Sequence, residues 1–195
     1  YNQTERDLLL IAVQLVVELL RVSGDIDALN RDHSHLTYES MYDHSTGLPN
    51  RRLFVDRLRL VYERDQRLFS VLLLGIENYH LLQERYGHGV GEHLMRMVVA
   101  RIRSALRTSD EIARLDEQQI SILLEDMLEG VDGETVARRL LEALSQPFDI
   151  DGHSILVNAS VGIAYRSGDA YPVESVVREA EIAMTQARQL PNSKI

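Results

Sequence analysis

The chain has 195 residues, 45% of them hydrophobic, which suits one globular domain with an appendage. Its formal net charge of −9 argues against a nucleic-acid-binding surface, because such surfaces gather lysine and arginine. The absence of cysteine excludes disulfides and zinc–thiolate sites and fits a reducing cytoplasm, where we expect the protein to work.

Residues 4–40 predict one long helix, since they contain no proline and one glycine, Gly24. Their apolar residues recur in alternating steps of four and three, the heptad pattern of a left-handed coiled coil. The centre of this seam is formed by Leu15, Leu19, Val22, Ile26 and Leu29. We predict a parallel homodimer through the seam. The alternative is a helix that folds back onto its own domain.

The first half of this helix, Leu8–Leu20, carries apolar residues on a second face as well. A helix that is apolar on two faces needs more than one partner, so we expect it to contact an upstream sensor domain. The same stretch is too short for a membrane span and contains Gln14 and Glu18. The chain starts at Tyr1 without a signal peptide, which suggests a fragment of a longer protein.

Beyond residue 40 the pattern alternates between helix and strand. The continuous apolar run Phe69–Ile76 predicts a central strand covered on both faces, and Ser154–Tyr165 predicts a second long strand. Apolar runs on either side of the polar stretch Asp116–Gln118 predict a hairpin. Helices are predicted at Arg51–Arg64, Tyr79–Tyr86, Gly91–Arg107, Glu134–Ser145 and Pro172–Leu190. Together these elements predict an α/β (α+β) domain, in which helices cover a mixed central sheet.

Several motifs occur in a fixed order along this region. Asp43–Phe54 reads DHSTGLPNRRLF, Arg85–Leu94 reads RYGHGVGEHL, and Arg107–Asp110 reads RTSD shortly before the hairpin. In order and spacing these segments resemble the GGDEF family, the diguanylate cyclase domains of bacterial signalling. The resemblance implies a nucleotide-cyclase palm-like fold for a domain at residues 41–195. Residues 1–40 resemble the last helix of a GAF-type sensor domain running into a signalling linker.

The catalytic signature of the family is missing at the hairpin, where the turn reads Asp-Glu-Gln118-Gln119. Relatives place one metal-binding carboxylate at the end of the first strand and another in this turn, and the matching residues are Gly75 and Gln119. Joining two GTP molecules requires a divalent metal, which prefers carboxylate oxygens. We therefore expect no magnesium site, no cofactor and no cyclase activity. In the alternative, a register shifted by two residues makes Asp116 and Glu117 the acidic pair of an active cyclase.

The nucleotide pocket that the resemblance implies is altered more mildly. Gln83 and Glu92 match the Asn and Asp with which relatives read guanine, and each is one methylene longer. His80 and Arg188 match lysines that contact phosphate in relatives. Because nucleotide binding needs tight geometry, we expect GTP to bind weakly at best.

Arg107-Thr-Ser-Asp110 matches the inhibitory Arg-x-x-Asp site that active relatives carry five residues before the signature. The resemblance implies that its ligand is cyclic di-GMP. A guanidinium binds phosphate or guanine in a two-pronged fashion, and Arg138 or Arg139 on the next helix would supply a second cation. In the simpler interpretation, the arginine ends a helix and the aspartate caps the segment after it.

Two functions fit this sequence. The first is an inactive domain that binds cyclic di-GMP and relays a sensor signal through a dimeric helix. The second is a transmitter that binds no nucleotide and regulates a downstream domain, such as an EAL phosphodiesterase. The EAL domain is suggested by analogy with the family alone.

Overall fold

The computed structural model describes residues 40–64, 69–125, 133–166, 172, 174–189 and 194–195. The chain divides between Ser40 and Met41 into two units, and the second, Met41–Ile195, holds nearly all of the described residues. The predicted N-terminal helix and its dimer seam from Leu15 to Leu29 lie outside the described residues. Within the described part of the chain, no helix is long and apolar enough to cross a membrane.

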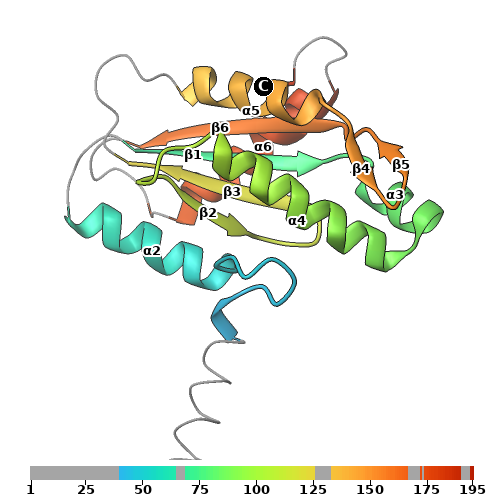
Figure 1. The fold of residues 1–195 in the computed structure, drawn as a ribbon. Coiled ribbons are helices and arrows are strands. Elements are labelled where there is room, and N and C mark those ends of the chain that lie inside the picture. The colour runs from blue at the N-terminus through green and yellow to red at the C-terminus, as the bar shows by residue number, and fades with distance from the viewer. Residues whose placement is uncertain (1–39, 65–68, 126–132, 167–171, 173, 190–193) are drawn as a thin grey trace, which may run out of the picture. The chain divides into compact units, whose positions relative to one another are not determined.

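The described elements alternate between helices and strands, as expected (Figure 1). In chain order they are α2 (Arg51–Arg64), β1 (Phe69–Ile76), α3 (Tyr79–Tyr86), α4 (His88–Ser104), β2 (Glu111–Arg114), β3 (Gln119–Leu124), α5 (Gly133–Ser145), β4 (Phe148–Ile150), β5 (His153–Ile155), β6 (Ala159–Arg166) and α6 (Glu174–Gln189). The predicted hairpin is confirmed as β2 and β3, and α2, α3 and β1 have their predicted bounds.

The main sheet has four strands in the order β2-β3-β1-β6, and β4 and β5 form a separate pair. The α/β class is confirmed, but each pairing in the main sheet is antiparallel, where a mixed sheet was expected. The reason is topological. The connection from β1 through α3 and α4 returns the chain to β2 in the direction of β1, and the hairpin then inserts β3 between them. Strands that run in the same direction are therefore never neighbours.

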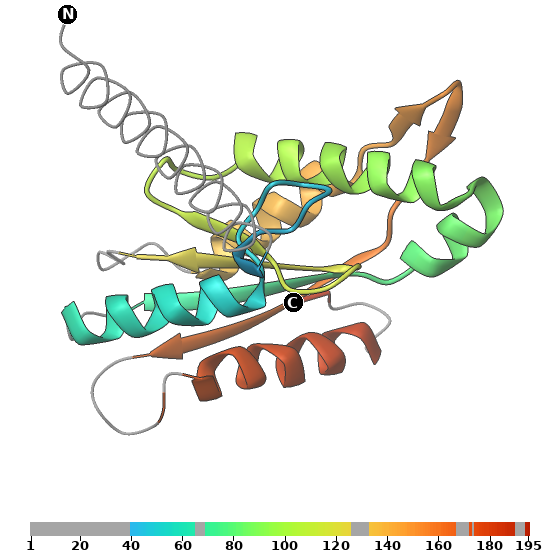
Figure 2. The ribbon, with the colours of Figure 1, turned by 90° about the horizontal axis from the view of Figure 1, so that it is seen from below.

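Two helical layers cover the two faces of this sheet (Figure 2). On one face Leu72 and Leu74 of β1 pack in a cluster with residues of α4 and α5. On the other face Val71 and Leu73 pack in a cluster with residues of α2 and α6. Every residue of β1 is buried, so the prediction of a central strand covered on both faces is confirmed.

The second long strand was predicted as one element, Ser154–Tyr165, and this prediction is wrong. The segment is divided between β5, which pairs with β4, and β6, which pairs with β1. Asp151 and Gly152 have positive φ angles of 51° and 77°, and this backbone shape suits a tight hairpin between β4 and β5. Further on, the Asn78 side chain donates to the Leu156 carbonyl and accepts from the Asn158 N–H, which fixes the chain between the two strands.

Helix α4 begins and ends three residues earlier than the predicted Gly91–Arg107. Gly87, with φ of 94°, separates it from α3, since this conformation favours glycine. At its other end the Ala105 N–H bonds to the Ile102 carbonyl, which tightens the last turn. As a result Arg107 lies in the loop between α4 and β2 rather than on a helix.

Helix α6 approaches β6 very closely at Gly162. A Cβ atom there would lie 2.0 Å from the Ala180 carbonyl oxygen and 2.2 Å from the Met184 nitrogen. Glycine thus permits backbone-to-backbone contact, and this contact fixes the height of α6 above the sheet. It also sets Met184 against the end of β1.

Candidate functional site

The two positions that the sequence analysis matched to the metal carboxylates of the family lie side by side in the sheet. Gly75 near the end of β1 is paired with Gln119 at the start of β3. Above Gly75 lies Met184 of α6, whose sulfur would be 2.8 Å from a Cβ atom at position 75. The Gln119 amide oxygen is buried and has no hydrogen-bond partner among the described residues. The predicted positions are thus brought together, and neither carries a carboxylate.

The turn between β2 and β3 fixes the register of this pairing. Gln119 is opposite Gly75, and the Asp116 carboxylate accepts the Gln118 N–H at 2.9 Å. Asp116 and Glu117 are exposed in the turn, and Gln119 rather than either acid is paired with Gly75. In the part of the chain that the structure describes, no group of three or more His, Asp or Glu is arranged to hold a metal ion.

Arg114, at the end of β2, holds this turn to two other segments. Its guanidinium is 3.1 Å from an oxygen of Asp43 and 3.4 Å from the carboxylate of Glu92 on α4. It also donates to the carbonyl oxygens of Asp116, at 3.1 Å, and Glu117, at 2.9 Å. The side chain is 3% exposed, so its charge depends on these partners. Arg114 thereby ties the turn between β2 and β3 to the loop before α2 and to α4.

The buried charges around Arg114 shift the protonation of their neighbours. Burial opposes ionisation of Asp43, but hydrogen bonds from Thr46 and the charge of Arg114 outweigh it and lower the pKa of Asp43. Burial also opposes the charge of Arg114, whose pKa is nevertheless raised by hydrogen bonds and charges from Glu92 and Asp43. Burial, followed by the charge of Glu92, raises the pKa of Tyr79. The lowered pKa of Asp43 and the raised pKa of Arg114 both favour the charged forms of this ion pair.

Gln83 and Glu92, which were predicted to match the guanine-reading positions, form hydrogen bonds within the protein. The Gln83 amide nitrogen donates to the Tyr79 hydroxyl at 3.2 Å and lies 2.8 Å from the His88 ring nitrogen. The Tyr79 hydroxyl in turn donates to Glu92 at 3.4 Å. Gln83 also lies across Gly91, where a Cβ atom would be 2.5 Å from its side chain. Gln83 and Glu92 are thus brought into one network, but their polar groups already have protein partners.

A cavity of about 300 Å³ remains beside this network. It is lined by Asp43, His44, His88, Glu92, Arg114, Leu115, Asp116 and Glu117. Its acidic side chains outnumber its one buried arginine, so it is poorly matched to a triphosphate. His80 and Arg188, the expected phosphate contacts, are both exposed and do not line it.

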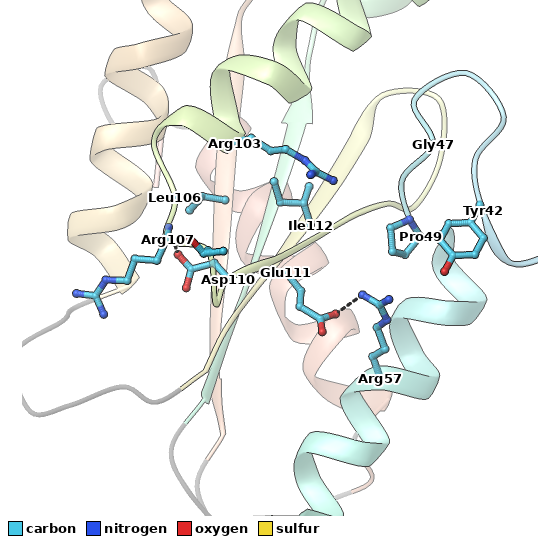
Figure 3. Close-up of a pocket in the computed structure, with 11 residues that line it drawn as sticks. Tyr42, Gly47, Pro49, Arg57, Arg103, Leu106, Arg107, Asp110, Glu111 and Ile112 are labelled. Carbon is cyan, nitrogen blue, oxygen red and sulfur yellow. Dashed lines mark hydrogen bonds and ion pairs between the residues drawn. The ribbon is translucent and has the colours of Figure 1, made fainter.

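The Arg107–Asp110 segment forms a closed turn after α4. The Arg107 N–H donates to the Asp110 carboxylate at 2.8 Å, and the Asp110 N–H donates to the Arg107 carbonyl at 3.1 Å. The Asp110 carboxylate therefore closes the turn that precedes it, and Arg107 lies beyond the end of α4 rather than at its last turn. The Arg107 guanidinium extends away from the turn (Figure 3). Its charge is left available to a ligand.

This turn borders a second cavity, of about 420 Å³ (Figure 3). Its lining residues are Tyr42, Gly47, Pro49, Arg57, Arg103, Leu106, Arg107, Thr108, Asp110, Glu111 and Ile112. Arg138 is not among them. Instead it is 70% exposed on α5 and binds Glu134 one turn earlier. The cavity is rich in arginine, which distinguishes it from the acidic cavity at the hairpin.

Three residues of these sites carry no clear signal in the sequence. Arg114 precedes the signature turn, but its spacing alone does not reveal that Asp43 and Glu92 converge on it. Met184 follows the apolar pattern of α6 and gives no sign that it covers Gly75. Arg103 lies in the last turn of α4, four residues before Arg107. This spacing is a weak sign that the two arginines border the same cavity.

Comparison with known proteins adds three findings. Residues 40–194 match the family described as "Diguanylate cyclase, GGDEF domain". The chain is 34% identical over 190 residues to the bifunctional diguanylate cyclase/cyclic di-GMP phosphodiesterase MucR of Pseudomonas aeruginosa, covering 93% of this chain and 28% of that protein. It spans 22% of the length of a second relative from the same organism, the cyclic di-GMP phosphodiesterase NbdA, at 29% identity and with 86% of this chain covered.

Solved structures agree with these matches. The GGDEF domain of TpbB from Pseudomonas aeruginosa superposes with a TM-score of 0.67 at 28% identity, over 75% of this chain and 90% of that one. The coiled coil and GGDEF domain of DgcB from Caulobacter crescentus, solved in complex with c-di-GMP, gives a TM-score of 0.73 at 19% identity, over 90% of this chain and 94% of that one. At 19% identity, the likeness to DgcB shows a shared fold and nothing further.

Proposed function

The chain belongs to the family of diguanylate cyclase GGDEF domains, and from that premise we propose that it is a catalytically inactive member that binds cyclic di-GMP. The family and its relatives take part in cyclic di-GMP signalling, as cyclases, phosphodiesterases or both by their names. The relatives are longer than this chain, so an upstream sensor domain and a downstream EAL domain belong to the proposal. The proposal also includes a parallel homodimer through residues 1–40 and a cytoplasmic location.

The loss of catalysis is supported by the pairing of Gly75 with Gln119. A cyclase needs a divalent metal to neutralise the triphosphate and activate the attacking hydroxyl. Hydrogen at one position and a neutral amide at the other provide no charged oxygen ligand at this edge of the sheet. The exposed acids Asp116 and Glu117 would in addition repel a triphosphate at the turn.

Ligand binding is supported by a different observation, which carries the proposal. Arg107 and Asp110 form the edge of an arginine-rich cavity of about 420 Å³, a size typical of small-molecule sites. A guanidinium matches phosphate or the acceptor edge of guanine, and a carboxylate matches the guanine N1–H and exocyclic amine. The protein's net charge of −9 opposes an anionic ligand, so binding must depend on these local arginines and weaken as salt increases.

A second candidate function is a transmitter that binds no nucleotide. It is favoured by the closed turn, because the Asp110 carboxylate already accepts the Arg107 N–H. A ligand that uses Asp110 must share the carboxylate with this bond or break it. In this second function the domain only relays torsion from the N-terminal helix to a following domain.

Calorimetric titration of the 195-residue chain with cyclic di-GMP separates these functions. We expect binding, and we expect Arg107→Ala to weaken it about ten- to hundredfold through loss of a charge-assisted hydrogen bond. Asp110→Ala should act similarly, while Gln119→Ala, at the hairpin, should leave the affinity unchanged. If the unmutated chain gives neither heat nor a thermal shift at high micromolar ligand, the receptor function is rejected and the transmitter remains. A parallel titration with GTP and magnesium should show weak binding at most.

A further inference from the structure

Given the proposed function, we propose further that Arg103, rather than Arg138, provides the second cation of the cyclic di-GMP site. The ligand then occupies the cavity between α4, β2 and the loop that precedes α2. Arg103 binds a phosphate of the ligand, and one guanine lies between β2 and the wall formed by Tyr42 and Pro49.

The direction of the side chains supports Arg103. Its guanidinium extends over Ile112 toward Pro49 and Tyr42, into the same hollow that the Arg107–Asp110 turn borders (Figure 3). The Arg107 guanidinium points away from Arg103 in the same view. Because Arg107 lies in an exposed loop, its side chain needs only rotation about its own bonds to meet a ligand at the rim.

The charges around the cavity leave Arg103 available. Arg57 is held by Glu111 at 2.7 Å, which neutralises both. Arg103 is exposed and forms no ion pair with any acid in the described part of the chain. Arg138 differs, because it already binds Glu134 on its own helix and lies outside the cavity lining. A free guanidinium gives up no existing ion pair when it binds a phosphate.

The edge of β2 offers hydrogen-bonding groups to the base. The Arg114 N–H points away from β3 and donates to the Pro49 carbonyl, while the Leu115 N–H bonds across the hairpin to Gln119. Backbone groups alternate along an antiparallel strand, so the N–H and C=O of Ile112 point outward like those of Arg114. Ile112 lines the cavity, and a donor–acceptor pair at this edge matches the donors and acceptors of a guanine.

The opposite wall has the shape of a base-binding surface. Tyr42 and Pro49 lie together at the far end of the cavity (Figure 3), where the isolated β-bridge between Tyr42 and Pro49 joins their backbones. The partly exposed Tyr42 ring offers a flat apolar face against which a purine can stack, and the buried Pro49 supports this end of the cavity. Leu106 and Ile112 add further apolar surface.

The test compares calorimetric titrations of cyclic di-GMP into the full chain and four variants. We expect Arg103→Ala to weaken binding about tenfold or more, and Arg138→Ala to change it less than about threefold. Tyr42→Leu should also weaken binding, since it removes the stacking surface. Arg178→Ala, which removes an exposed arginine on α6 across the sheet, is the matched control for net charge and should change nothing.

The outcomes separate this inference from the proposed function. If the unmutated chain binds, and Arg138→Ala abolishes binding while Arg103→Ala does not, the assignment of Arg103 is overturned and the receptor function stands. If Arg103→Ala and Arg178→Ala weaken binding equally, general charge explains the effect and the assignment also fails. If the unmutated chain does not bind cyclic di-GMP, both are rejected. A melting curve of each variant checks that it is folded. Because Arg103 and Arg138 are exposed, we expect their replacement by alanine to leave the melting temperature nearly unchanged.

Discussion

Gly75 and Gln119 face each other across the antiparallel pairing of β1 and β3. The thioether of Met184 occupies the space beside Gly75. This edge of the sheet therefore has no carboxylate at either paired position, and an apolar side chain from α6 lies against one of them.

The first prediction concerns catalysis. The chain should form no cyclic di-GMP from GTP and magnesium, measured by chromatography of the products. The double variant Gly75→Asp, Gln119→Glu should remain inactive, because Gln83 and Glu92 would still be held in their network with Tyr79. The acidic turn would still oppose the triphosphate. Turnover by the unmutated chain that disappears in Asp116→Ala or Glu117→Ala would contradict the assigned register.

The second prediction concerns the close contact of α6 with β6. Gly162→Ala should lower the free energy of unfolding by about 1–3 kcal/mol or more, because the new methyl would lie 2.0 Å from the Ala180 carbonyl oxygen. Urea unfolding followed by circular dichroism measures the change.

Gly89→Ala is the matched control for Gly162→Ala. It lies within α4, where a Cβ atom meets no atom within 4 Å and φ is not positive, so alanine should stabilise the helix by roughly 0.5–1 kcal/mol. Equal effects of the two substitutions would show that the α6 contact does not resist a methyl group.

The third prediction concerns pH. The pKa of Asp43 is lowered in the folded state by Thr46 and Arg114, against the effect of burial. The stability that this provides is fully present above the unfolded pKa of about 3.9, and is lost as pH falls through the lower folded value. Asp43→Asn should therefore be less stable than the unmutated chain at neutral pH.

The difference between the two melting temperatures should shrink as pH falls below about 4, because the unmutated carboxylate then becomes protonated. Asp149→Asn, at an exposed position of β4, is the control and should show no comparable difference at neutral pH. A difference between Asp43→Asn and the unmutated chain that stays constant down to about pH 2 would exclude the ion pair with Arg114 as its cause.

The fourth prediction concerns assembly and depends on the heptad pattern of residues 4–40. If the seam is intermolecular, the chain is a dimer, and Leu19→Asp with Ile26→Asp should make it a monomer, since unpaired charges are strongly disfavoured in a buried seam. Light scattering after size exclusion measures the mass. An unchanged mass with a folded globular domain would favour a helix folded back on its own domain.

Several elements were predictable because their signals are local. The continuous apolar run Phe69–Ile76 indicated a strand buried on both faces, and the polar break at Asp116–Gln118 indicated a hairpin. Ser154–Tyr165 misled for the same reason. Its apolar residues continue through Leu156 and Val157, while the division into two strands depends on Asn78, which is distant in sequence.

The sequence by itself determined the family, the course of β1 and the hairpin. Tertiary structure alone decided that Arg114 joins Asp43 to Glu92, that Met184 covers Gly75, and that Arg103 lies in the cavity beside Arg107 while Arg138 does not. The physical reason is that periodicity and motif spacing report on neighbours along the chain. Which charges meet, and which side chain covers a given backbone position, depends on how helices pack on the two faces of the sheet.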